Sequence, residues 1–215
     1  MTAAPIRWII WDWNGTLLDD VAYGLALTDR LLRHFHLEPM ETVENYRERF
    51  GFPIVDYYAA LGFDRFIFPT VAVIWMDEYM RGDASIPLQK DAVRTAERFR
   101  DHGLEQVIIS ASKLENLQAQ LKLRPQFDFF SPPCGLSDIY AGSKVDIARA
   151  WMQRQGVSKD ETLLIGDTLH DLEVAQALGC RCVLVENGHQ SKKRLQAAGA
   201  RTFPNLTAIA DWLCP

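Results

Sequence analysis

The sequence contains few cysteines and no paired cysteine motif. The four cysteines, at positions 134, 180, 182 and 214, do not form the C-x-x-C spacing that is typical of zinc and redox sites. We therefore expect no such site. The cysteines are interpreted as small apolar side chains that pack inside the fold.

Long apolar runs and basic runs are also missing. No uninterrupted apolar stretch reaches the ~18 residues of a membrane-spanning helix. The net charge is −5 and the basic residues are spread along the chain. Residues 1–8, "MTAAPIRW", lack the charged start, apolar block and cleavage site of a signal peptide. These absences predict a cytoplasmic protein that binds neither a membrane nor nucleic acid.

The sequence does contain short apolar, β-prone segments that alternate with segments of helical periodicity. We expect strands over residues 7–11, 106–110, 162–165 and 182–185, and helices over residues 88–102, 113–123, 144–155 and 169–178. Residues 127–133 are compatible with a further short strand. This alternation is typical of right-handed βαβ units, so it predicts an α/β fold with a parallel sheet.

From residue 19 to about residue 81 the chain shows helical periodicity and no strand pattern. The segment that follows, "RGDASIP", is predicted to be a linker. This all-helical stretch interrupts the alternating pattern directly after the first strand. We therefore predict a core domain made of residues 1–18 and 88–215 that carries a helical insertion over residues 19–87, with hinges at the junctions.

Polar side chains follow several of the expected strands. Asp12 follows the first strand, Ser110 and Ser112 close the second, and Asp167 and Asp171 come after "TLLI". Lys144 begins a helix after a Gly-Ser turn. Because ligands of open parallel sheets bind beyond the carboxyl ends of the strands, we expect these side chains to share one edge.

This set of residues favours phosphoryl chemistry. Two carboxylates from neighbouring strands would repel each other at close range unless a cation compensated them. All-oxygen ligation suits Mg²⁺, which commonly shares its shell with phosphate oxygens. Lys144 and a serine hydroxyl are natural partners for a phosphoryl group. The residues therefore suggest Asp12 as a nucleophile that forms an aspartyl-phosphate.

With these residues in these positions, the sequence resembles the haloacid dehalogenase superfamily, and most of all its phosphoglycolate-phosphatase-like branch. Residues 12–16, "DWNGT", match the first motif; Ser110 matches the second, Lys144 the third, and residues 166–171, "GDTLHD", the fourth. The helical stretch lies where the family inserts a helical cap. The resemblance thus implies a Rossmann-like core with an α-helical cap domain.

The resemblance also implies roles for individual residues. Mg²⁺ would be held by Asp12, the backbone carbonyl of Asn14 and Asp167, and Asp171 would either bind the metal directly or orient its ligand shell. Ser110 and Lys144 would bind the phosphoryl oxygens, with Ser112 as a competing donor. The substrate would be a small phosphorylated metabolite, and the protein a monomer or a homodimer. In the cap, Arg47 or Arg49 is a candidate for binding a second anionic group of the substrate.

Asn14 departs from the family pattern, in which a second aspartate protonates the leaving oxygen and later activates water. Its loss removes a contribution typically worth about 10²–10⁴-fold in rate. We therefore expect a slow or leaving-group-selective phosphatase, least affected with acyl or aryl esters. We also expect Asn14→Asp to speed the hydrolysis of alkyl phosphates. The alternative is a catalytically impaired phosphate-binding or phosphoacceptor protein.

Other readings fit the residues less well. Phosphonate hydrolysis in this family uses a lysine of the cap, but the first lysine of this chain is Lys90. Dehalogenation needs no metal, and a phosphoacceptor receiver domain needs no cap. Two further expectations concern residues near the motifs: Trp13 faces the cleft, and His170 is exposed.

Overall fold

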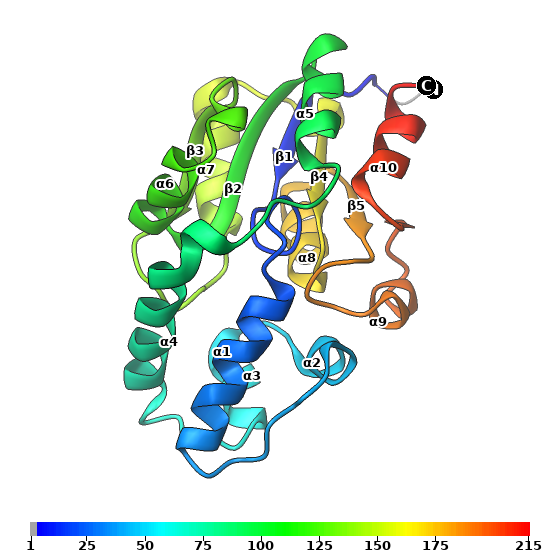
Figure 1. The fold of residues 1–215 in the computed structure, drawn as a ribbon. Helices are drawn as coiled ribbons and strands as arrows, with labels where there is room; N and C mark the ends of the chain where they lie inside the picture. Colours follow the sequence, from blue (N-terminus) through cyan, green and yellow to red (C-terminus); the bar gives the residue numbers. More distant parts are fainter. Residues whose placement is uncertain (1–3) are drawn as a thin grey trace.

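The structure is a computed structural model that describes residues 4–215. Within this range the strands form one parallel sheet of six strands in the order β3-β2-β1-β4-β5-β6 (Figure 1). The strands are β1 (Trp8–Trp11), β2 (Glu105–Lys113), β3 (Ser131–Leu136), β4 (Thr162–Gly166), β5 (Arg181–Val185) and β6 (Thr202–Phe203). The predicted α/β fold is confirmed. Residues 1–3 lie outside the described range. They belong to the predicted core piece 1–18 and to the N-terminal stretch that is not expected to be a signal peptide.

Helices cover both faces of the sheet. They are α5 (Ala92–Asp101), α6 (Leu114–Lys122), α7 (Val145–Gln155), α8 (Leu169–Leu178), α9 (Lys192–Ala197) and α10 (Leu206–Leu213). Successive β1 residues point to opposite faces, so Ile9 and Trp11 pack with α5, α6 and α10 whereas Ile10 packs with α7 and α8. Burial on both faces explains why β1 and β4 read as unbroken apolar runs.

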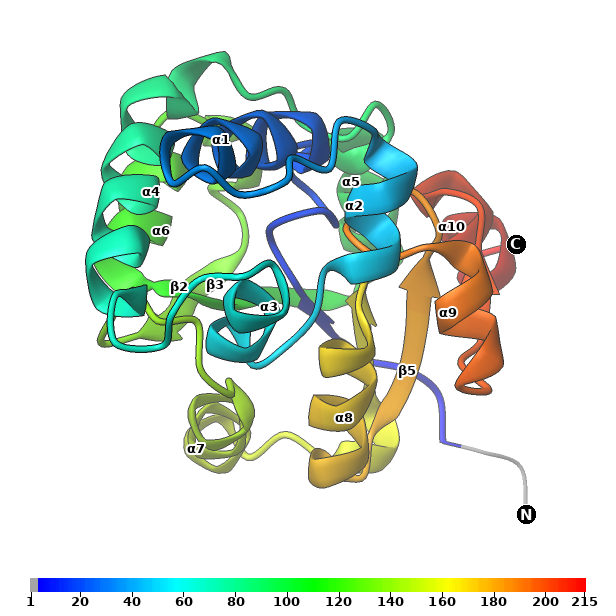
Figure 2. The same cartoon turned by 90° about the horizontal axis from the view of Figure 1, so that it is seen from below.

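Four further helices lie beyond the carboxyl ends of the strands (Figures 1 and 2). They are α1 (Val21–His34), α2 (Val43–Arg49), α3 (Ile54–Ala60) and α4 (Phe68–Gly82). They share a hydrophobic cluster of their own, which includes the buried residues Leu32, Tyr58 and Val71. We propose that residues 19–87 form a cap domain over a core of residues 1–18 and 88–215.

Some boundaries differ from the sequence-based expectation. The ambiguous stretch 127–133 contributes only its end to a strand, because β3 begins at Ser131. Strand β6 was not predicted, since two residues are too few to show a period.

Within residues 4–215, no helix is long and apolar enough to cross a membrane.

Candidate active site

Three carboxylates meet at the carboxyl ends of β1 and β4. The two strands are neighbours with Trp11 opposite Ile165, so the residues that follow them, Asp12 and Asp167, lie side by side. Asp171 joins them from the first turn of α8. One oxygen from each carboxylate lies within 4.8 Å of the other two. The structure therefore brings together the three acids that the sequence placed in one site.

The loop after β1 can pass this close to Asp167 only because it contains Gly15. Gly15 has a φ of +74°, and a Cβ atom at this position would lie 2.3 Å from Asp167 Oδ2. The next residue, Thr16, donates a hydrogen bond from Oγ1 to Asp167 Oδ1 at 3.0 Å. A side chain at position 15 would therefore separate the two strand ends.

Lys144 is the cation of the acid cluster. Its side chain is fully buried, its Nζ forms an ion pair with Asp12 Oδ1, and it lies 2.7 Å from Asp171 Oδ1. Burial alone would lower the pKa of Lys144, but the charges of Asp12 and Asp171 outweigh burial and raise the pKa above its usual value. Lys144 is therefore charged at any physiological pH.

One lysine does not compensate three carboxylates. Burial raises the pKa of Asp12 to about 6, although Lys144 opposes this rise. Burial also raises the pKa of Asp167 to about 8, with Asp12 and Asp171 adding to the rise and His189 opposing it. Such raised pKa values indicate that the negative charge of this cluster is not fully compensated, so an additional positive charge would stabilise it.

Asp171 has a structural role as well as a charge. Its Oδ2 accepts hydrogen bonds from the backbone N–H groups of Asp167 and Thr168 and from Thr168 Oγ1 at 3.2, 3.0 and 2.8 Å. Thr168 and Asp171 thus form a capping box at the start of α8. Despite burial, Lys144 and these hydrogen bonds lower the pKa of Asp171, so it remains ionised.

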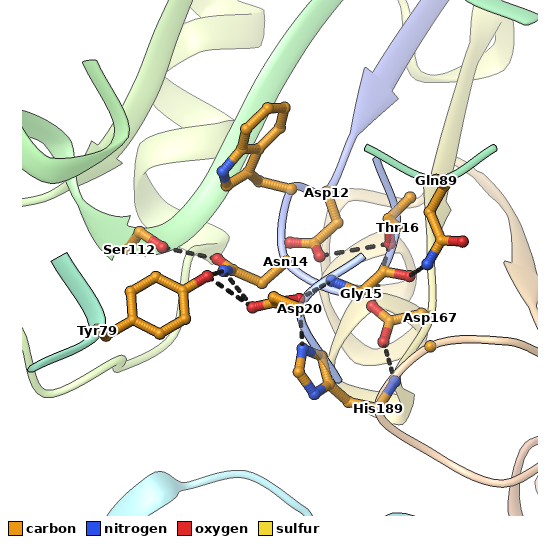
Figure 3. A network of polar contacts seen from close by, with 12 residues as sticks. Asp12, Asn14, Gly15, Thr16, Asp20, Tyr79, Gln89, Ser112, Asp167 and His189 are labelled. Atoms are coloured by element: carbon orange, nitrogen blue, oxygen red, sulfur yellow. Dashed lines mark hydrogen bonds and ion pairs between the residues drawn. The ribbon is translucent and has the colours of Figure 1, made fainter. Parts of the chain in front are cut away.

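The side chain of Asn14 is held by three partners (Figure 3). Its Nδ2 donates to Asp20 Oδ2 and to Tyr79 Oη, each at 2.8 Å, and its Oδ1 accepts from Ser112 Oγ at 2.9 Å. Ser110 Oγ donates in turn to Ser112 Oγ at 3.1 Å. Both serines therefore belong to this edge of the site, with Ser112 bound to Asn14.

Asp20 and His189 form a buried pair that the sequence analysis missed. His189 Nε2 lies 3.2 Å from Asp20 Oδ1, which also accepts from the backbone N–H of Gly15 at 2.8 Å (Figure 3). Burial disfavours the charged form of each residue, but the attraction and hydrogen bond between them outweigh burial. The pKa of Asp20 is therefore lowered and that of His189 is raised to about 9. Since His189 follows β5, the rule used for the other strand ends would have singled it out.

The same loop attaches the cap to the core. His189 Nδ1 lies 2.8 Å from the hydroxyl of Tyr46 in α2. Arg47 donates from Nε to the carbonyl of Gly188 at 2.8 Å and from Nη2 to that of Asn187 at 2.6 Å. Arg47 therefore contacts backbone carbonyls of the core. Arg49 is exposed and does not line the cavity beside the acids, so the structure does not bring it to the site.

Two expectations about residues near the motifs are wrong. Trp13 does not face the cleft: it is fully buried, donates to Gln120 Oε1 at 2.9 Å and packs edge-on against Phe127. His170 is not exposed, because Phe52 of the cap stacks on its ring with the centroids 4.5 Å apart. Both partners are distant in sequence, which is why local pattern did not reveal them.

The geometry agrees with a match to a known family. A family model of haloacid dehalogenase-like hydrolases matches residues 9–185, which include Asp12, Ser110, Lys144, Asp167 and Asp171. The chain belongs to the haloacid dehalogenase-like hydrolase family. The resemblance inferred from the four motifs is thereby confirmed, and so is the expectation of a hydrolase.

Individual relatives of this haloacid dehalogenase-like hydrolase are distant in sequence. A phosphoglycolate phosphatase from Pseudomonas putida is 24% identical over 200 residues, which are 89% of this chain and 73% of the relative. The crystal structure of a predicted phosphatase from Clostridium acetobutylicum has a TM-score of 0.83 at 20% identity and covers 98% of this chain and 99% of that chain. CbbY from Rhodobacter sphaeroides, crystallised with phosphate, has a TM-score of 0.70 at 15% identity over 95% of this chain and 96% of that chain.

Proposed function

We propose that the protein is a Mg²⁺-dependent phosphatase that hydrolyses a small phosphate monoester through an aspartyl-phosphate on Asp12. The observation that carries this proposal is the meeting of Asp12, Asp167 and Asp171 within 4.8 Å, with Lys144 paired to the first and third. The family match supports a hydrolase, and the names of the relatives support phosphate monoesters as substrates.

The donor set fits a magnesium ion. Asp12, Asp167, Asp171 and the backbone carbonyl of Asn14 supply only oxygen ligands, as Mg²⁺ prefers. The cluster contains three carboxylates and one lysine, so a divalent cation would bring it close to neutrality. When bound, Mg²⁺ supplies positive charge that stabilises the phosphoryl oxygens.

The nucleophilic attack and the binding of the phosphoryl oxygens fall to Asp12, Lys144 and Ser110. One Asp12 oxygen attacks phosphorus, the bond from phosphorus to the leaving oxygen breaks, and the leaving group departs with that electron pair. The ammonium group of Lys144 has three N–H donors. Two face Asp12 and Asp171, which leaves the third for a phosphoryl oxygen. Ser110 can serve as a second donor for the phosphoryl group when its hydroxyl turns away from Ser112, to which it donates in this structure. Water then attacks phosphorus, the bond from phosphorus to the Asp12 oxygen breaks and returns its electron pair to the carboxylate, and the released phosphate keeps the protons of the water.

Asn14 has no titratable proton to give to the leaving group. Its amide is held by Asp20, Tyr79 and Ser112, so it positions the loop after β1. We therefore infer a phosphatase that depends on a leaving group stable as an anion. The same observation supports a second candidate function, a phosphoacceptor or phosphate-binding protein whose intermediate persists. The predicted cytoplasmic location and the predicted monomer or homodimer stay predictions.

The test is a screen for phosphate release over acyl, aryl and alkyl phosphates, with and without Mg²⁺. The proposal expects release that requires Mg²⁺, is lost with EDTA, and is absent in Asp12→Asn. Tight phosphate binding without turnover of any ester would instead support the second candidate. Release that Asp12→Asn retains would reject both.

A further inference from the structure

The cavity beside the acid cluster has an apolar wall on the side of the cap. It has a volume of about 140 Å³ and reaches from Asp12, Ser110 and Lys144 to the helices of the cap. The cap contributes seven aromatic rings to its wall, from Tyr46, Phe50, Phe52, Tyr57, Tyr58, Trp75 and Tyr79. Cavities of about 150 Å³ hold a single benzene ring in other proteins, and this cavity also includes the space for a phosphoryl group, so it limits the leaving group to one ring at most.

Three of the four tyrosine hydroxyls of this wall, those of Tyr46, Tyr57 and Tyr79, already contact a partner in the protein. The hydroxyl of Tyr46 pairs with His189 Nδ1 at 2.8 Å, and that of Tyr79 donates to Asp20 Oδ2 at 2.7 Å. The hydroxyl of Tyr57 lies 3.7 Å from the sulfur of Met40. The wall therefore offers ring faces and edges to a ligand more than hydrogen-bonding groups.

Among the described residues, no buried cation without a carboxylate partner lines the cavity, and Lys113, which also lines it, is partly exposed and pairs with the exposed Glu115. Within residues 4–215, no arginine lines the cavity, and every lysine or histidine that does so has a carboxylate partner. The pairs are Lys144 with Asp12 and Asp171, Lys113 with Glu115, His170 with Glu173, and His189 with Asp20. A carboxylate on the leaving group would lose its hydration against aromatic rings without a counterion, which is unfavourable.

We propose that the leaving group of the substrate is a single aromatic or similarly sized apolar alcohol without a second anion, and not a carboxylate such as glycolate. This inference rests on the proposed function. Two independent features agree on it. The wall favours burial of apolar surface, and Asn14 favours a leaving group that needs no proton. An aryloxide meets both conditions, because it is a weaker base than an alkoxide and departs with the electron pair of the broken P–O bond.

The first test compares benzyl phosphate with phosphoglycolate at one Mg²⁺ concentration. Both release a primary alcohol, so the comparison isolates the ring from the carboxylate. We expect a kcat/KM at least about 100-fold higher for benzyl phosphate, on the scale of a site that leaves a charged group unpaired. Phenyl phosphate, which has the better leaving group, is expected to react faster still. Phosphoglycolate reacting as well as benzyl phosphate would overturn the inference.

A second test does not depend on turnover. Benzylphosphonate and phosphonoacetate differ in the same way as the two esters but are not hydrolysed. Calorimetry in Mg²⁺ is expected to show that the wild-type protein binds benzylphosphonate at least about tenfold more tightly. Equal binding, or tighter binding of phosphonoacetate, would overturn the inference. Absence of Asp12-dependent phosphate release from every ester would reject the proposed function, independently of this preference.

A pair of variants on α4 tests the wall itself. Met76→Arg adds a cation to the cavity wall, whereas Ile74→Arg adds the same charge on the exposed side of the same helix. Met76→Arg is expected to shift the preference by about tenfold or more towards phosphonoacetate, and Ile74→Arg to leave it unchanged. Equal effects of the two variants, both melting as the wild type does, would show that this wall does not contact the ligand.

Discussion

Asn14 and Asp20 form a complementary pair: the amide Nδ2 of Asn14 donates to Asp20 Oδ2 at 2.8 Å, and the hydroxyl of Tyr79 contacts both side chains. Asp20 also accepts from the backbone N–H of Gly15 and pairs with His189. An aspartate at position 14 would place a half-buried carboxylate at hydrogen-bonding distance from the buried carboxylate of Asp20. The amide at position 14 is therefore matched to the carboxylate at position 20.

The first prediction adds a stability effect to the sequence-based expectation that Asn14→Asp speeds the hydrolysis of alkyl phosphates, because Asp20 contacts position 14. The single substitution is expected to destabilise the protein by about 1–3 kcal/mol, because a buried donor is lost and like charges meet. The exchanged double variant, Asn14→Asp with Asp20→Asn, restores one amide and one carboxylate. It is expected to recover only part of the lost stability, because His189 loses its carboxylate partner at position 20, and to hydrolyse benzyl phosphate about tenfold or more faster than wild type, since position 14 can then donate a proton. Thermal melts and kcat values check both statements. A single variant as stable as wild type would contradict the pairing.

The second prediction concerns Lys144. Lys144→Met removes the cation from between Asp12 and Asp171 and is expected to lower kcat/KM by about 10²–10³-fold, as loss of a preorganised charge in a closed site does. The melting temperature is also expected to fall, because two buried carboxylates lose their partner. Lys159→Met, at an exposed lysine, is the matched control. Unchanged kcat/KM in Lys144→Met would exclude Lys144 from the reaction.

The third prediction concerns pH and metal at Asp167. Burial, with Asp12 and Asp171 nearby, raises the pKa of Asp167 from 3.8 to about 8. An acid whose pKa is higher in the folded state stabilises folding only while protonated, so its contribution is lost as the pH rises from 3.8 towards 8. Asp167→Asn is therefore expected to melt several degrees above the metal-free wild type at pH 8 while losing turnover.

Magnesium should reverse this difference. At about 100 times its dissociation constant, a ligand that binds only the folded protein stabilises it by roughly 2.7 kcal/mol. We expect Mg²⁺ to raise the melting temperature of the wild type and of the exposed-site control Asp160→Asn, but not that of Asp167→Asn. An equal Mg²⁺ effect on all three proteins would place the metal elsewhere.

The fourth prediction separates the two arginines of α2. Arg47 donates to the carbonyls of Gly188 and Asn187, whereas Arg49 is exposed. Arg47→Ala is expected to loosen the contact between cap and core and to lower kcat/KM by about tenfold, because closure excludes water from the site. Arg49→Ala is expected to behave as wild type. A raised KM in Arg49→Ala alone would instead support the sequence-based assignment of Arg49 to substrate binding.

The parallel sheet and its strand-end acids could be predicted because their signals are local. Asp12 and Asp167 each follow a short apolar run, and neighbouring parallel strands bring such residues to one edge. The Asp20–His189 pair is different: His189 follows β5 and could have been noted at a strand end, but nothing in the sequence marks Asp20, at the start of α1, as its partner. The burial of Trp13 likewise depends on Gln120, 107 residues away. The cavity wall was unpredictable because it depends on how α1–α4 pack on one another and on the core.

The most direct measurement is the capture of the covalent intermediate on Asp12. Protein mixed with Mg²⁺ and an aryl or acyl phosphate is quenched in acid, digested and examined by mass spectrometry. The proposal predicts a phosphoryl group on the peptide that contains Asp12, absent without Mg²⁺ and absent in Asp12→Asn. Phosphate release by Asp12→Asn at the wild-type rate, or a phosphoryl group on a different residue, would contradict it.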